Sequence, residues 1–224
     1  MGRIARRFVA DAPPQSLLDR MAAAYLAADT DIAATLRAMF TSAEFAASTG
    51  AKWRRPQELM ATLMATARPT YKPPTNTSDT WAPLGTYMWI LEVLGHHPMS
   101  WPTPDGPKDL GAAWCHPGAL LGRWNAAEAI AGAWDPTLVP TPWAQVFGLQ
   151  AGQTYAFAAD RIVYALTGIH PSAADRDLLA RFLARPTGGA GTPAPTTPMS
   201  ADALKWNLAE TVRLAMASPY AALR

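Results

Sequence analysis

Residues 13–28 read PPQSLLDRMAAAYLAA, and this stretch indicates how the chain folds. Its two prolines stand where a helix begins, at positions whose backbone N–H groups have no partner inside the helix. Apolar side chains then recur every three or four residues, at Leu17, Leu18, Met21, Ala24, Tyr25 and Ala28. That spacing places them on one helix face, which a core can cover. The stretch therefore predicts an amphipathic helix.

Similar signals recur along the chain and predict an all-α fold. Asp31 and Pro56 are typical of helix starts, and Thr41 to Glu44 resembles a capping box. Together with apolar spacing, such signals predict helices at residues 31–40, from 56, 79–95, 117–132, from 141, 154–168, 172–185 and 200–218. No stretch alternates as a strand would, and the Pro-, Thr- and Asn-rich residues 69–79 are predicted as a loop. We expect an irregular bundle of about eight helices with a long loop, rich in Pro and Trp, at residues 95–116.

The chain is expected to divide at a low-complexity stretch. Residues 1–185 are predicted to form one helical domain. Residues 186–199 are rich in Pro, Gly and Thr, a composition typical of a flexible surface linker. Residues 200–224 then form a C-terminal helix that packs back on the domain.

Composition excludes several classes of function. Charged residues make up 16% of the 224 residues and the formal net charge is +2, without the basic blocks of a nucleic-acid-binding protein. No run of about 18 apolar residues is present, so no membrane span is predicted. The single cysteine, Cys115, has no partner for an internal disulfide. A Cys115–His116 nucleophile pair is not expected, because sequence neighbours rarely reach the required geometry. No cofactor motif was found.

The 95–116 loop is the most informative feature of the sequence. A loop of about 20 residues inside a compact domain is uncommon and often functional. Trp101, Trp114 and Trp124 could line an aromatic groove, or they could anchor the loop onto the helices. Both interpretations remain open.

Histidines and carboxylates near this loop raise the question of a metal site. The residues that could contribute imidazole or carboxylate ligands are His96, His97, Asp105, Asp109 and His116. Their spacing matches no compact metal signature, and His96 and His97 are adjacent, so they point to different sides. The sequence therefore predicts no metal site, with His96 and His116 as the residues to examine.

Polar residues on the following helix suggest a second role. Arg123 is expected to reach back to Asp105 or Asp109 and pin the loop, and the alternative is that it binds an anionic substrate. Asn125 and Glu128 can share one face of this helix. No catalytic residue is predicted. The candidate binding residues are Trp101, Asp105, Trp114, Arg123 and Asn125.

Two segments around the loop carry a family resemblance. Residues 94–107 read LGHHPMSWPTPDGP and residues 114–125 read WCHPGALLGRWN. They resemble the Trp-Pro-x-Pro-x-Gly, Trp and Leu-Leu-x-Arg-x-Asn segments of the bacterial family known as domain of unknown function 1800. Three further stretches are similar to family segments: Arg6 to Val9, Ser42 to Phe45, and Lys52 with Pro56 and Glu58.

The resemblance implies a context but no chemistry. Family members are about twice as long, so this chain is expected to correspond to their C-terminal half, and His96 stands where they usually carry Gln. They are often exported, although this chain shows no signal peptide, and are often encoded beside a sulfatase-like companion protein. The resemblance identifies no catalytic residues.

Two functions from different classes fit the sequence. The first is a helical binding or scaffold module that acts with a companion protein. The second is an extracytoplasmic hydrolase-type enzyme whose site is shared with a missing N-terminal half. An enzyme should gather at least two of His96, Asp105, His116 and Glu128 in one pocket, whereas a module should present an exposed apolar patch.

Overall fold

A computed structural model describes residues 1–72, 84–135, 137–186 and 191–224. Twelve α-helices, a 3-10 turn at Gly111–Trp114, a π-helical turn and one very short sheet make up the regular structure of these residues, so the all-α prediction is confirmed. The helices exceed the expected number because several consist of a single turn, which apolar periodicity cannot detect. None of the described helices is both long and apolar enough to cross a membrane.

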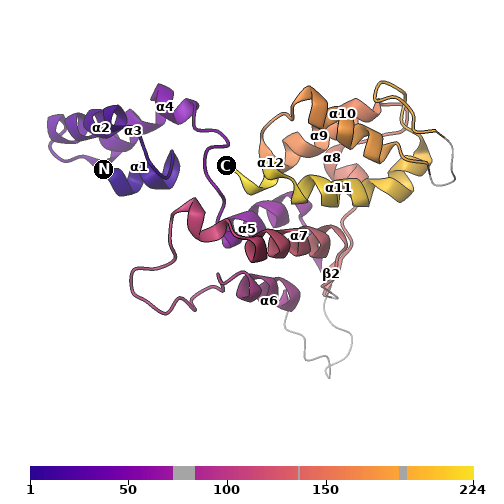
Figure 1. The fold of residues 1–224 in the computed structure, drawn as a ribbon, viewed down its shortest axis with the longest axis horizontal. Coiled ribbons are helices and arrows are strands. Elements are labelled where there is room, and N and C mark those ends of the chain that lie inside the picture. The colour runs from indigo at the N-terminus through magenta and orange to yellow at the C-terminus, as the bar shows by residue number, and fades with distance from the viewer. Residues whose placement is uncertain (73–83, 136, 187–190) are drawn as a thin grey trace.

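The first four helices form an N-terminal unit at one end of the molecule (Figure 1). They are α1 (Gly2–Phe8), α2 (Gln15–Ala27), α3 (Ile32–Phe40) and α4 (Ala43–Ala46). The Asp31 carboxylate accepts the N–H groups of Ala33 and Ala34 and starts α3, and the Ser42 hydroxyl starts α4 in the same way. Their buried faces make a small separate core of Ala5, Val9, Leu17, Met21 and Met39.

The remaining helices share the main core. They are α5 (Pro56–Ala67), α6 (Gly85–Val93), α7 (Pro117–Ala131), α8 (Trp143–Phe147), α9 (Tyr155–Thr167), α10 (Ala173–Leu183), α11 (Leu208–Ala217) and α12 (Pro219–Ala222). Helix α7 lies at the centre, in contact with α5, α6 and α11, while α9 packs against both α10 and α11 (Figure 1). Small buried residues along α7, among them Ala119, Ala126 and Ala129, allow this close approach.

Several elements differ from the sequence-based expectation. Thr70–Tyr71 (β1), inside the predicted 69–79 loop, pairs antiparallel with Leu138–Val139 (β2). Helix α6 begins at Gly85, and the earlier part of the predicted 79–95 helix lies outside the described residues. Ser200 caps the helical segment predicted at 200–218 by accepting the Ala203 N–H, and this segment includes a π-helical turn at Ala203–Asn207 before α11.

Residues 195–199 also differ from the flexible linker expected there. The backbone of Met199 exchanges hydrogen bonds with Gly152 and Gln153, and Tyr155 and Ala156 donate to Thr197 and Pro195. The Met199 side chain is buried in the main core. This stretch is therefore held against the start of α9 because its backbone finds partners there, which composition alone does not reveal. Residues 187–190 of the predicted linker lie outside the described residues.

Candidate functional site

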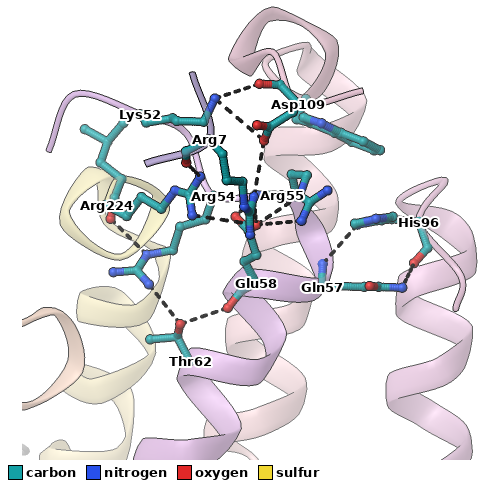
Figure 2. Close-up of polar contacts among 12 residues, drawn as sticks. Arg7, Lys52, Arg54, Arg55, Gln57, Glu58, Thr62, His96, Asp109 and Arg224 are labelled. Carbon is teal, nitrogen blue, oxygen red and sulfur yellow. Dashed lines mark hydrogen bonds and ion pairs between the residues drawn. The ribbon is translucent and has the colours of Figure 1, made fainter. Parts of the chain in front are cut away.

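Glu58, in the first turn of α5, is the centre of an ionic junction (Figure 2). Its carboxylate accepts the backbone N–H of Arg55 at 3.0 Å and the Arg55 guanidinium at 2.9 Å. Arg7 of α1 forms an ion pair with the same carboxylate, and the Arg224 guanidinium lies 3.8 Å from it. A single carboxylate thus holds three cations from three parts of the chain.

Lys52 forms the second half of the junction. Only 3% of its surface is exposed, and its ammonium group lies 2.6 Å from an Asp11 carboxylate oxygen. It also donates to the backbone carbonyl of Asp109 at 2.6 Å, while the Asp109 carboxylate accepts from Arg7 at 3.2 Å (Figure 2). The 95–116 loop is therefore pinned by Lys52 and Arg7.

The pKa values of the two acidic groups reflect this pairing. Burial alone would raise the pKa of Glu58, but the Arg55 N–H, Arg7 and Arg224 outweigh it and the net pKa is lowered. Burial would likewise raise the pKa of Asp11, but the Lys52 ammonium and the Gly111 N–H outweigh it, and the pKa is lowered. Both carboxylates are ionised and engaged near neutral pH, so neither acts as a free general base.

The C-terminal residues complete the junction. Arg224 exchanges backbone hydrogen bonds with Lys52 and donates through its guanidinium to the Arg7 carbonyl at 2.5 Å. The backbone N–H of Arg54 donates to Ala222 at 2.8 Å, and its guanidinium donates to the Leu223 carbonyl and to Thr62. The junction, formed by Arg7, Asp11, Lys52, Arg55, Glu58, Asp109 and Arg224, therefore joins the N-terminal unit, α5, the loop and the chain end.

His96 lies beside this junction in a structural position (Figure 2). It is buried, and its Nδ1 accepts the backbone N–H of Gln57 at 3.2 Å, while the Gln57 amide donates to the His96 carbonyl at 3.1 Å. Its ring lies 4.9 Å from the Trp114 ring. Burial and the nearby Arg55 lower the pKa of His96, so the imidazole remains neutral as this hydrogen bond requires.

The two loop tryptophans are neighbours that differ in burial. Trp114 is buried and donates from Nε1 to the Lys108 carbonyl at 2.8 Å, which anchors the loop. Trp101 is half-buried, 6.3 Å from the Trp114 ring, and donates to Thr103 at 3.0 Å. Asp105 is exposed, and its bonds with Thr103 and Lys108 lower its pKa to about 2. The observed position of Trp114 therefore fits the interpretation that it anchors the loop onto the helices.

The expectation for Arg123 was wrong. Its guanidinium reaches neither Asp105 nor Asp109 but donates from Nη2 to the Arg54 carbonyl at 2.5 Å and lies over the Trp53 ring. The physical reason is its position on the face of α7 that packs against residues 53–54, away from the loop carboxylates. Asn125 is exposed on α7, whereas Arg123 is buried. The two differ because residues two positions apart lie on nearly opposite sides of a helix.

The remaining ionisable candidates are dispersed. His116 caps the start of α7 by accepting the Ala119 N–H at 3.2 Å, and His97 contacts Ser100. Glu128 pairs with Arg213 at 2.9 Å, and Cys115 is exposed. In the described part of the chain, no three His, Cys, Asp or Glu residues are grouped so as to hold a metal ion.

An apolar groove lies over α7, α10, α11 and α12, and of the three tryptophans considered in the sequence only Trp124 is among its lining residues. Its volume is about 430 Å³. Three large side chains on its walls remain exposed, namely Trp124 at 53%, Leu178 at 67% and Leu214 at 43%. We call it the Trp124 groove; its other lining residues include Val163, Pro171, Leu179 and Pro219.

A hydrogen-bonded cluster fixes one wall of the Trp124 groove. The Tyr220 hydroxyl of α12 donates to the Asp175 carboxylate at 2.7 Å and accepts the Ser172 N–H at 3.0 Å. Ser172 also donates to Asp175 at 2.7 Å, and these two hydroxyl donors lower the pKa of Asp175. Helix α12 is therefore attached to the start of α10, which keeps the groove walls in place.

The fold and site together define an all-α protein with an ionic junction and an apolar groove. The family model described as protein of unknown function (DUF1800) matches residues 1–223. The chain therefore belongs to the DUF1800 family, in agreement with the sequence resemblance. No curated protein and no solved structure matches the chain.

Proposed function

We propose that the protein is a binding module and that its Trp124 groove holds an apolar segment of a partner polypeptide. One observation carries this proposal: Trp124, Leu178 and Leu214, from three different helices, are exposed around a single cavity. Contiguous exposed apolar side chains are typical of protein-binding surfaces, and tryptophan is enriched there. A ligand larger than the cavity would cover all three.

The ionisable residues give no comparable support to the enzyme alternative. A hydrolase-type site would need at least two of His96, Asp105, His116 and Glu128 in one pocket. Each instead has its own partner elsewhere: Gln57, Lys108, the Ala119 N–H and Arg213, respectively. The companion protein expected from the family resemblance remains our proposed source of the bound segment.

An uncharged apolar peptide tests the proposal directly. Acetyl-Leu-Leu-Phe-amide, titrated by isothermal calorimetry, is expected to bind the wild-type protein saturably. Leu178→Glu and Leu214→Glu should each weaken binding about tenfold or more, because a carboxylate in an apolar interface loses its water. Leu26→Glu is the matched control, since Leu26 is 75% exposed on α2, in the N-terminal unit. Equal affinity in all four proteins, or no binding to the wild type, would refute the proposal.

A further inference from the structure

The Trp124 groove adjoins a second, smaller cavity of about 130 Å³. Trp124, Ala217, Ser218 and Pro219 line both spaces, so the two lie next to each other on either side of these residues. The other walls of this smaller space, which we call the Arg123 cavity, are Trp53, Leu59, Leu120, Arg123, Met216 and Ala222.

Arg123 is the charged residue in this lining, which is apolar apart from Ser218. It is only 3% exposed, and it uses one nitrogen, Nη2, to donate to the Arg54 carbonyl. Its Nε and Nη1 atoms have no hydrogen-bond partner among the described residues. Burial lowers the pKa of Arg123, yet an arginine side chain stays protonated in proteins. A buried cation thus keeps unused donors at the wall of a cavity.

Such an arrangement is costly without a ligand. Buried N–H donors of a charged group that lack acceptors destabilise a protein, because the water they lose is not replaced by another partner. In the described structure, the nearest recorded partners of the side chain are a neutral carbonyl and the Trp53 ring. The Glu58 carboxylate acts on Arg123 electrostatically but makes no hydrogen bond with it. An anion entering the cavity would supply the missing acceptor.

We propose that the apolar segment held by the Trp124 groove ends in a free carboxylate, and that this C-terminal carboxylate pairs with Arg123. The inference rests on the proposed function. A carboxylate carries one negative charge and matches one guanidinium, whereas a phosphate would bring more charge and stronger hydration into an apolar cavity. The small volume has room for a chain end rather than for a continuing polypeptide.

Paired peptides test the carboxylate without changing the protein. Acetyl-Leu-Leu-Phe with a free C-terminus is expected to bind the wild type at least about tenfold more tightly than its amide, the effect of one buried charge-assisted hydrogen bond. If the amide binds as tightly as the acid, this inference is wrong while the proposed function stands. If neither peptide binds, the proposed function itself fails.

A third peptide separates a chain end from an acidic side chain. Acetyl-Leu-Leu-Glu-amide carries its only charge on the side chain. We expect it to bind no more tightly than acetyl-Leu-Leu-Phe-amide. An affinity equal to that of the free-acid peptide would overturn the assignment of the cavity to a C-terminus.

Substitution of Arg123 assigns the effect to this side chain. Arg123→Met should abolish the preference for the acid, so that the acid and the amide bind the variant with equal affinity. Arg37→Met is the matched control, because Arg37 is exposed on α3, away from the groove. A preserved preference in Arg123→Met would contradict the inference. Should Arg123→Met fail to fold, Arg123→Lys replaces it, because lysine keeps the charge but loses the planar fork. The comparison of the acid and the amide on the wild type also decides without any variant.

Discussion

The Nδ1 atom of His96 accepts the backbone N–H of Gln57 at 3.2 Å, across 39 positions of sequence. Gln57 is in the first turn of α5, where backbone N–H groups have no partner within the helix. A protonated imidazole has no lone pair to accept such a bond. Only the neutral form of His96 can therefore make this bond, which connects the 95–116 loop to the helix that carries Glu58.

His96→Gln is expected to remove a pH dependence of stability. Burial and Arg55 lower the pKa of His96 in the folded state, so the unfolded chain binds more protons as the pH falls below the ordinary histidine pKa of about 6.5. The wild-type free energy of unfolding should therefore fall between pH 7.5 and 5.5. A glutamine amide oxygen can accept the same N–H without titrating, so the variant should show a shallower slope.

Urea unfolding at several pH values measures this difference. His97→Gln is the control, because His97 lies nearer the surface and contacts Ser100 rather than α5. Parallel stability–pH curves for the wild type and His96→Gln would show that His96 does not sense pH in this range.

Lys52→Met is expected to destabilise the protein strongly. Lys52 is buried, and it donates to the 38%-exposed Asp11 carboxylate and to the Asp109 carbonyl; losing such charge-assisted hydrogen bonds costs about 1.5–3 kcal/mol. Lys108→Met, which removes an exposed pair with Asp105, should change stability by no more than about 1 kcal/mol. Chemical denaturation of both variants gives the comparison. Similar losses in the two would mean that the ionic junction does not contribute as a buried network.

We expect Glu58 to make a separate, acid-sensitive contribution to the stability of the fold. Its pKa is lowered in the folded state, so its stabilising effect is present above the ordinary glutamate pKa and is lost as the pH falls through the folded value. Between pH 6 and 3, Glu58→Gln should therefore lose less stability than the wild type, although it is less stable at pH 7. Glu92→Gln, on the surface of α6, serves as the control in thermal melts. An equally steep acid loss in Glu58→Gln would assign that loss to other carboxylates.

Local signals allowed the helices, but not the sites, to be predicted. Asp31, Ser42, Pro56 and Ser172 mark helix starts because each acts on its own neighbours. The Trp124 groove has no such signal, because Trp124, Leu178 and Leu214 meet only after α7, α10 and α11 have packed together.

Arg123 shows the same limit. Helical spacing placed it correctly on α7, yet its partner is a backbone carbonyl at Arg54, 69 positions away, rather than the nearer loop carboxylates. Carbonyl acceptors are present at every residue, so sequence cannot identify which one a long side chain reaches. The buried junction around Glu58 is hidden for a similar reason, since its cations come from Arg7, Arg55 and Arg224.

Gly122→Ala tests the close packing of α7 against the end of α6. Helix propensity alone predicts a gain of about 1 kcal/mol for this change. A Cβ at Gly122, however, would lie 3.1 Å from Cγ of the buried Leu94 and closer still to its Cδ2. Overpacking of this kind costs about 1–3 kcal/mol, so we expect a net loss of up to about 2 kcal/mol.

Gly118→Ala, on the same helix, is the matched control for this packing. Its new Cβ would meet the His116 ring at an ordinary 3.5 Å, so only the propensity term applies and stability should rise by up to about 1 kcal/mol. Urea denaturation of the two variants should therefore show changes in the free energy of unfolding that have opposite signs. If Gly122→Ala were the more stable of the two, Leu94 would have to move aside freely. The close contact of α6 with α7 would then not restrict the size of the side chain at position 122.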